Sequence, residues 1–267
     1  MSRIIRSRDN AVVKQMIALA HSARDRKKLG LTVLDGIHLI RAYADALGAP
    51  QRIAVAESAV ARDEVRALLT QCGGADVVVL ADPLMSEISS LESPAFVVAT
   101  IQTPQVSPLA AGACMLLLED LQDPGNVGSL LRSAAAAGIR EVVTSRSTAF
   151  AWSPKVLRAA QGAHFALNIS EGRDLLNVLA DYNGTSIALV VDPDPPASIY
   201  DCELAGPVAF LIGNEGAGLS SVLRGAASVR VTIPMPGRAE SLNAAAAGAV
   251  CLFEMVRQRI HRRGSRG

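Results

Sequence analysis

Three segments in the second half of the chain place glycines and polar side chains at the ends of predicted strands. In open α/β sheets ligands bind there, because the loops at the carboxyl ends of the strands meet at one edge. The first segment is LEDLQDPGNVGSLLRSAAAAGI (118–139). A Pro-Gly turn precedes Asn126, which is placed to cap a helix over 127–138, and Arg132 lies off the apolar stripe of that helix. Taken singly, an ordinary cap and an ordinary surface charge explain both residues.

The second segment, FLIGNEGAGLS (210–220), is a glycine-rich loop that follows an apolar strand. Its G-x-x-G-x-G spacing differs from the G-x-G-x-x-G of dinucleotide binding, and the chain has no G-x-x-x-x-G-K-[ST] phosphate loop. The glycines allow the backbone to approach a ligand, and Asn214 and Glu215 are the only polar side chains inside the loop. Alone, this segment is explained by a plain glycine-rich turn.

The third segment, IPMPGRAESLNAAAAGAVCLFEMVRQR (233–259), begins where a predicted strand ends at Ile233. Its prolines and glycine favour an extended loop, after which Ser241, Leu242 and Asn243 open an alanine-rich helix that runs to residue 260. The small residues allow a neighbouring backbone or an identical subunit to pack closely. Core packing accounts for the alanines but not for the Ser-Leu-Asn triplet.

Alternating strands and helices must position these segments. In the second half, the apolar patterns predict strands at 114–119, 141–145, 186–192, 208–213 and 228–234. The first half shows the same alternation, with strands predicted at 31–35, 52–56, 76–81 and 95–101 after a basic helix over 10–29. This order predicts an α/β fold with a mainly parallel sheet covered on both faces.

A stretch of linker composition divides the chain. QTPQVSPLAAG (102–112) has two prolines and neither a helical nor an alternating pattern. We therefore expect an N-terminal domain over 1–102, a linker over 103–112 and a C-terminal domain over 113–267. The most apolar strands lie in the C-terminal part, which we expect to carry the catalytic site.

Composition excludes several classes of protein. The 267 residues are 50% hydrophobic and 19% charged, which is typical of a folded chain with a real core. Aromatic residues make up only 3%, so rows of base-stacking side chains are not expected. Four scattered cysteines and four histidines lack the spacing of a disulfide framework or of a metal site. No stretch has the length of a signal peptide or a membrane span, so a soluble cytoplasmic protein is expected.

The formal net charge of +1 conceals basic ends on an acidic middle. Residues 1–41 carry nine basic and three acidic side chains, and the tail from Arg257 onward carries five arginines and no acid. Basic clusters of this kind indicate contact with a polyanion such as RNA, although a solvated helix and a frayed tail would explain either end alone.

In their order and spacing, the three segments resemble the signature motifs of the SpoU (TrmH-type) family of RNA ribose 2′-O-methyltransferases. The resemblance covers about residues 115–260. The first half, with NAVVKQMIAL and VLDGIHLI, looks like the small α/β substrate-binding domain, resembling a ribosomal protein, that many members carry. The resemblance implies a trefoil-knotted (SPOUT-type) C-terminal methyltransferase domain and a homodimer that completes the active site.

The resemblance also implies S-adenosylmethionine as the cofactor, held by backbone groups of the second and third motifs. Apolar side chains and main-chain amides suit the recognition of adenine. By position, the cofactor-binding residues would be Leu211, Gly213, Asn214, Gly218, Ile233, Met235 and Leu242.

The implied chemistry is in-line attack of a ribose 2′-hydroxyl on the activated methyl group, so the protein must align the nucleophile and manage its proton. Arg132 corresponds to the catalytic arginine of the family. Because arginine stays protonated in proteins, we expect it to clamp a phosphate and stabilise the developing alkoxide. The other implied catalytic residues, which we expect to orient Arg132 and the ribose, are Asn126, Glu215, Ser241 and Asn243. Glu215 would be an alternative proton acceptor if burial raised its pKa.

Ribosomal RNA is the substrate that the extra N-terminal domain favours, and transfer RNA is the alternative. Two other classes stay open: a non-catalytic RNA-binding member of the fold, and a nucleotide-dependent oxidoreductase, which the glycine spacing disfavours. No metal and no membrane partner are expected. The candidate contacts to the RNA backbone are the basic residues Arg6, Arg8, Lys14, Arg24, Arg26, Lys27 and Lys28.

Overall fold

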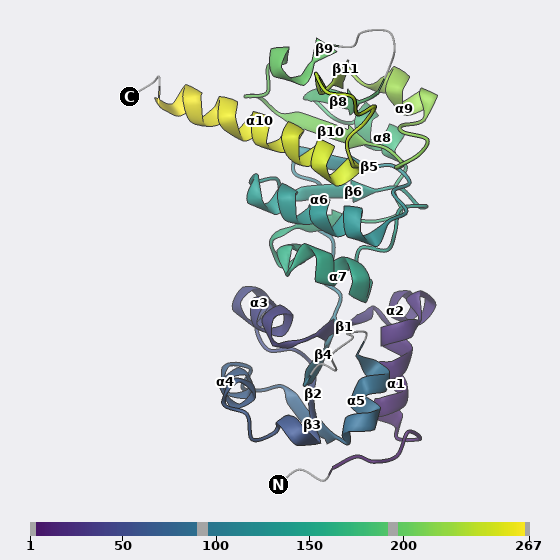
Figure 1. Cartoon of the computed structure of the whole chain (residues 1–267), viewed down its shortest axis with the longest axis vertical. Coiled ribbons are helices and arrows are strands. Elements are labelled where there is room, and N and C mark those ends of the chain that lie inside the picture. Colours follow the sequence, from purple (N-terminus) through teal and green to yellow (C-terminus); the bar gives the residue numbers. More distant parts are fainter. Residues whose placement is uncertain (1–3, 90–95, 192–196, 265–267) are drawn as a thin grey trace. The chain divides into compact units, whose positions relative to one another are not determined.

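The computed structural model describes residues 4–89, 96–191 and 197–264, and the side chains of these residues as far as Arg262 (Figure 1). Its contacts divide the chain into two units. The first comprises the residues up to Gln105 together with Trp152–Phe165, and the second comprises Val106–Ala151 and Ala166–Gly267. The domain limits given above stay a prediction, and the contacts add that a short segment of the second half packs with the first unit.

The first unit contains a four-stranded sheet of order β1-β4-β2-β3. Its strands are β1 (Leu31–Asp35), β2 (Arg52–Ala56), β3 (Asp76–Leu80) and β4 (Val97–Gln102). Only β2 and β3 run parallel, whereas β4 runs antiparallel to both of its neighbours. The expectation of a mainly parallel sheet is wrong for this unit, because strand alternation with helices does not fix the direction of the last strand.

Helices flank this sheet. They are α1 (Ala11–His21), α2 (Ala23–Leu29), α3 (Ile37–Leu47), α4 (Asp63–Gln71), α5 (Asp82–Ile88) and α7 (Pro154–Ala160). The single basic helix predicted over 10–29 is two helices. Ser22 has an extended backbone between them, and its side chain accepts a hydrogen bond from the Asp25 N–H, so it caps α2. The segment that contains α7 is tied to β1 by the Thr32 hydroxyl, which donates to the Trp152 carbonyl at 2.8 Å.

The second unit contains a seven-stranded sheet in which every pairing is parallel. Its order is β7-β6-β5-β10-β8-β11-β9. The strands are β5 (Met115–Leu118), β6 (Glu141–Thr144), β7 (Asn168–Ser170), β8 (Thr185–Leu189), β9 (Ala197–Ser198), β10 (Val208–Ile212) and β11 (Val229–Thr232). Here the predicted parallel sheet is confirmed, and the carboxyl ends of β5, β10 and β11 lie at one edge.

The two faces of β10 bury different partners because successive side chains of a strand point to opposite sides. Ala209 and Leu211 belong to the core that includes residues of α8 (Leu175–Ala180) and α9 (Ser221–Ala226). The short α9 follows the glycine loop directly, where no helix was expected. Ile212 faces the other side, on which α6 (Pro124–Ala136) and α10 (Ala244–Gly264) pack against each other (Figure 1).

The small residues of α10 are explained by this packing. A Cβ atom added to Gly248 would lie 2.3 Å from Leu130 Cδ2 and 2.5 Å from Ile212 Cδ1, so a larger residue would separate the helix from α6 and the sheet. Among the described residues, no helix is long and apolar enough to cross a membrane, and no group of three metal-ligating side chains is found. All four cysteines are free thiols.

Candidate active site

Helix α6 follows the loop after β5 and begins at Pro124, three residues earlier than predicted. Asp123, not Asn126, is the N-cap: its carboxylate accepts a hydrogen bond from the Asn126 N–H at 2.9 Å, and Pro124 takes the first helical position. The prediction of Asn126 as the cap is therefore wrong. Since Asn126 lies inside the first turn and is 8% exposed, its side chain is free for a different role.

A chain of hydrogen bonds joins the three motifs through Asn126. Its amide Nδ2 donates to Glu215 Oε1 at 3.0 Å, and its Oδ1 accepts from Asn243 Nδ2 at 2.8 Å. Asn243 Oδ1 in turn accepts from the N–H groups of Ala245 and Ala246, so Asn243 caps α10. The helix thus begins at Ala244 and not at Ser241. Each amide has one defined orientation, because the carboxylate at one end only accepts and the helix N–H groups at the other end only donate.

Glu215 is held by the loop that follows β5. Its Oε1 accepts from the Asp123 N–H at 3.0 Å and its Oε2 from the Gln122 N–H at 3.1 Å. Partial burial acts to raise the pKa of Glu215, but the hydrogen bonds from Asn126, Gln122 and Asp123 outweigh it, and the pKa lies below its ordinary value. The condition for Glu215 to serve as a proton acceptor, a pKa raised by burial, is not met.

Asn214 braces the glycine loop. Its Nδ2 donates to the Asp120 carbonyl at 2.8 Å, and its Oδ1 accepts from the N–H groups of Gly216 and Ala217, both at 2.9 Å. Close packing of the backbone requires a glycine at position 213, since an added Cβ would lie 2.2 Å from the backbone N of Leu219. The loop is consequently a rigid backbone turn whose glycine serves chain packing.

A cavity of about 350 Å³ lies beside this turn, between the loops that follow β8, β10 and β11. Six of the seven predicted cofactor residues line it: Gly213, Asn214, Gly218, Ile233, Met235 and Leu242. Leu211 does not: its side chain is buried in the core that includes residues of α8 and α9, and the expected contact of its backbone with the cofactor stays a prediction. The lining also includes Glu215 and Ser241. Apolar side chains and polar groups, including backbone amides, share this wall, and the combination fits an adenosine-sized cofactor.

Arg132 lies on the exposed side of α6, outside the cavity. Its guanidinium makes no hydrogen bond or ion pair with any residue that the structure describes. Glu215 and Asn243 are bonded to Asn126 and to backbone groups, so the expected orientation of Arg132 by these residues is not found within one chain. Ser241 is exposed at the mouth of the cavity.

Most of the predicted RNA-binding residues are exposed. Arg6 and Arg8 form ion pairs with Glu57 and Glu87, each at 2.6 Å, and Lys14 pairs with Asp9 at 2.8 Å. The exposed residues of α2 are Arg24, Lys27 and Lys28.

Arg26 is the exception and its assignment to RNA is wrong. It is 6% exposed, and its Nη1 donates to the carbonyls of Leu19 and Ala20 at the end of α1. Of the basic tail, Arg257 pairs with Glu254 and Arg262 with Glu203, whereas Arg266 and the side chain of Arg263 lie outside the described residues.

The loop residues that hold Glu215 were not predicted from the sequence. Asp120 adopts a left-handed backbone conformation, with φ 54°, which turns the chain so that the Gln122 and Asp123 N–H groups reach the carboxylate. The available signal was the Asp-Pro pair at 123–124, which is typical of an N-cap followed by proline at the first helical position.

Comparisons with known proteins agree with this architecture. The family model described as SpoU rRNA Methylase family matches residues 113–253, and the one described as MRM3-like substrate binding domain matches residues 10–99. The chain is 29% identical to the 23S rRNA (guanosine(2553)-2′-O)-methyltransferase RlmP of Bacillus subtilis, over 94% of this chain and 98% of that protein.

A second relative is the 23S rRNA (uridine(2479)-2′-O)-methyltransferase of Streptomyces viridochromogenes, 32% identical over 97% of this chain and 93% of that protein. The crystal structure of the SpoU methyltransferase AviRb from the same organism, in complex with AdoMet, matches with a TM-score of 0.84 and 29% identity, over 94% of this chain and 98% of that one. The chain therefore belongs to the SpoU rRNA methylase family, with an N-terminal substrate-binding domain before an α/β SPOUT-type methyltransferase domain.

Proposed function

We propose that the protein is an S-adenosylmethionine-dependent methyltransferase that methylates a ribose 2′-hydroxyl of ribosomal RNA. The observation that carries this is the hydrogen-bonded chain Glu215–Asn126–Asn243, which joins the three family motifs beside the cavity. The substrate follows from family membership and from the named activities of two relatives that align over nearly the whole chain.

The cavity beside the glycine loop would hold the cofactor. Backbone groups of Gly213 and Gly218 and the apolar side chains of Ile233, Met235 and Leu242 line it. When bound, S-adenosylmethionine supplies an activated methyl group. This chain's residues fix the wall of the cavity: Asn214 locks the loop on one side, and Asn243 fixes the start of α10 on the other.

The site is built for electrostatic positioning. Hydrogen bonds from Asn126 and from the backbone N–H groups of Gln122 and Asp123 outweigh burial and hold the pKa of Glu215 below its ordinary value, so this carboxylate is ionised. It therefore fixes the loop before α6 and leaves the proton of the 2′-hydroxyl to another acceptor. Arg132, exposed and without an internal partner among the described residues, is available to bind the phosphate next to the target ribose and to stabilise the alkoxide.

A homodimer would complete this site. Helix α10 exposes Phe253 (48%) and Ile260 (64%) seven residues apart, and therefore on one face. Large apolar side chains in such a row favour contact with a second copy of the chain. Ribosomal RNA as the substrate makes the cytoplasm the expected compartment.

Transfer of labelled methyl from S-adenosylmethionine to unmodified ribosomal RNA tests the proposal. We expect a 2′-O-methylated nucleotide with the wild type and its loss with Arg132→Ala. Label on a base would contradict the assigned chemistry, and label in transfer RNA but not in ribosomal RNA would contradict the assigned substrate.

A further inference from the structure

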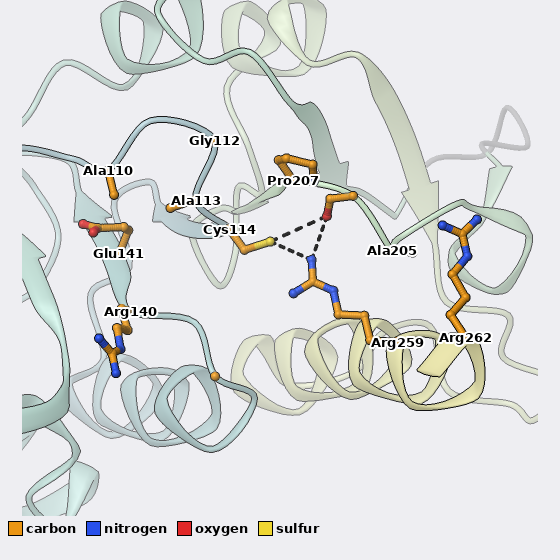
Figure 2. A pocket seen from close by; sticks show the side chains of 12 residues that line it. Ala110, Gly112, Ala113, Cys114, Arg140, Glu141, Ala205, Pro207, Arg259 and Arg262 are labelled. Atoms are coloured by element: carbon orange, nitrogen blue, oxygen red, sulfur yellow. Dashed lines mark hydrogen bonds between the residues drawn. The ribbon is translucent and has the colours of Figure 1, made fainter. Parts of the chain in front are cut away.

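A second and larger cavity lies in the same unit, at the opposite edge of the parallel sheet. Its volume is about 720 Å³, and it opens at the amino ends of β5, β6 and β10, away from the carboxyl ends that carry the motifs (Figure 2). Its wall includes Gly112, Cys114, Arg140, Glu141, Gly206 and Arg259. The first and third segments reach it only with Gly138 and Arg259 at their far ends, and none of the predicted catalytic, cofactor-binding or RNA-binding residues lines it.

Arg259 is fixed in this wall by neutral groups. Its Nη2 donates to the Gly206 carbonyl at 2.7 Å and to Cys114 Sγ at 2.8 Å (Figure 2). Its Nε donates to the Leu204 carbonyl at 3.4 Å. The other arginines described on this part of α10 differ, since Arg257 and Arg262 pair with the carboxylates of Glu254 and Glu203. Arg259 is thus held in place while no carboxylate of the described residues pairs with it.

Arg140 supplies a second uncompensated charge. It is exposed and has no hydrogen bond or ion pair from its guanidinium within the described part of the chain. The one carboxylate of the wall, Glu141, is 7% exposed and accepts from Asn168 Nδ2 at 2.7 Å. In Figure 2, Arg140 lies on one side of Cys114 and Arg259 on the other. The wall therefore carries an excess of positive charge on two sides.

Bare backbone occupies much of the remaining wall. Gly112 and Gly138 have φ of +68° and +77°, and a Cβ built on either of them, or on Gly206, would meet no atom within 4 Å. These glycines border open space, so a ligand can approach the main chain there without meeting a side chain.

We propose that this cavity binds a phosphate group through Arg140 and Arg259. Guanidinium groups donate charge-assisted hydrogen bonds to phosphate oxygens. On Arg259, Nη1 remains to donate because Nε and Nη2 are bonded to the wall, and a guanidinium fixed in this way loses little freedom on binding. The phosphate belongs either to the backbone of an RNA or to a free phosphoryl compound, and the two sources are separated by the test below. The inference does not depend on the methyl transfer proposed above.

Cys114 provides a local probe, because its half-buried thiol lines the cavity between the two arginines. The rate of its alkylation by iodoacetamide is followed by mass spectrometry in the full-length protein, with the half-buried Cys202 as an internal reference. Inorganic phosphate, unmodified ribosomal RNA and sodium chloride of matched ionic strength are compared. At ten times its Kd, a ligand in the cavity slows alkylation of Cys114 about tenfold, by the factor 1 + [L]/Kd.

Arg140→Gln is the test variant. The Arg140 side chain is exposed and has no partner among the described residues, so we expect the fold to stay intact without it. Its Kd for phosphate should rise about tenfold, the equivalent of one lost charged hydrogen bond. Arg66→Gln, an exposed arginine of α4, is the matched control and should behave as the wild type.

Protection of Cys114 by phosphate and by RNA, weakened in Arg140→Gln, supports the site with RNA as a source. Protection by phosphate alone supports the site with a free phosphoryl ligand as the source. Equal slowing by chloride, parallel slowing of Cys202, or no difference between Arg140→Gln and the wild type would overturn the proposal.

Discussion

Asn126 donates its side-chain amide to Glu215 Oε1 at 3.0 Å, and this bond connects the first turn of α6 to the glycine loop after β10. The same asparagine accepts from Asn243, so one buried side chain fixes the relative positions of all three motifs. An amide can do this because it donates at one end and accepts at the other. A carboxylate or an alkyl group at this position could satisfy only one neighbour or none.

The stability of the protein should depend on Glu215 in acid. The folded state holds the pKa of this carboxyl below its ordinary value, so its contribution is present above that value and is lost as the pH falls through the lowered pKa. Urea unfolding between about pH 6 and pH 3 should show that Glu215→Gln loses less stability in acid than the wild type. Equal losses in the two proteins would contradict the hydrogen-bonding pattern described for Glu215.

Arg132→Ala should reduce kcat about 10²- to 10³-fold, the cost of removing one donor to a developing oxyanion. The melting temperature should change little, because the side chain is exposed and has no partner among the described residues. Methyl transfer and thermal unfolding are measured on the same preparation. Arg66→Ala is the control, and an equal loss of activity in it would remove the case for a specific role.

Gly213→Ala should destabilise the fold by about 3 kcal/mol or abolish it, since the added methyl group would meet backbone atoms that cannot move aside. Gly216→Ala in the same loop is the matched control, because its Cβ would lie 3.7 Å from the nearest side-chain atom and meets no backbone. Denaturant unfolding separates the two variants. A tolerated Gly213→Ala would mean that the glycine loop can relax more than its contacts indicate.

Substitutions of exposed basic residues in α2 should change RNA binding, whereas substitution of the buried Arg26 should change stability. Lys28→Glu combined with Arg24→Glu should weaken RNA binding and flatten its salt dependence, because fewer counterions are released. Arg26→Ala should instead destabilise the first unit by about 1–3 kcal/mol, since two carbonyls at the end of α1 lose a charged donor. Filter binding at several salt concentrations and urea unfolding distinguish these effects. An unchanged salt slope in the double variant would show that this face of α2 only contacts solvent.

Phe253→Asp should shift the protein from dimer to monomer in light scattering, because a charge would replace an exposed apolar side chain on α10. Val222→Asp, at an exposed apolar position on α9, is the control and should keep the wild-type mass. If the two variants have the same mass as the wild type, α10 is not the dimer surface.

The sequence predicted where the site lies but not how its residues connect. Strand ends and glycine spacing located the cavity wall, because parallel strands bring their carboxyl ends to one edge. Leu211 does not line the cavity, since strand alternation buries its side chain in the core, and its backbone contact with the cofactor stays a prediction. Arg26 was misplaced because charge composition does not show which turn of α2 faces α1. The role of Asn126 depended on Glu215, 89 residues away, which no local pattern reveals.

The bond between Asn126 and Asn243 spans 117 residues of sequence, and the residue at its far end caps the last helix of the chain. Contacts between such distant positions form late in folding, because a long loop must close first. A chain still emerging from the ribosome can complete the first unit but has no α10 to lock Asn126. Competence for catalysis should therefore arise only once α10 has been made and has packed against α6.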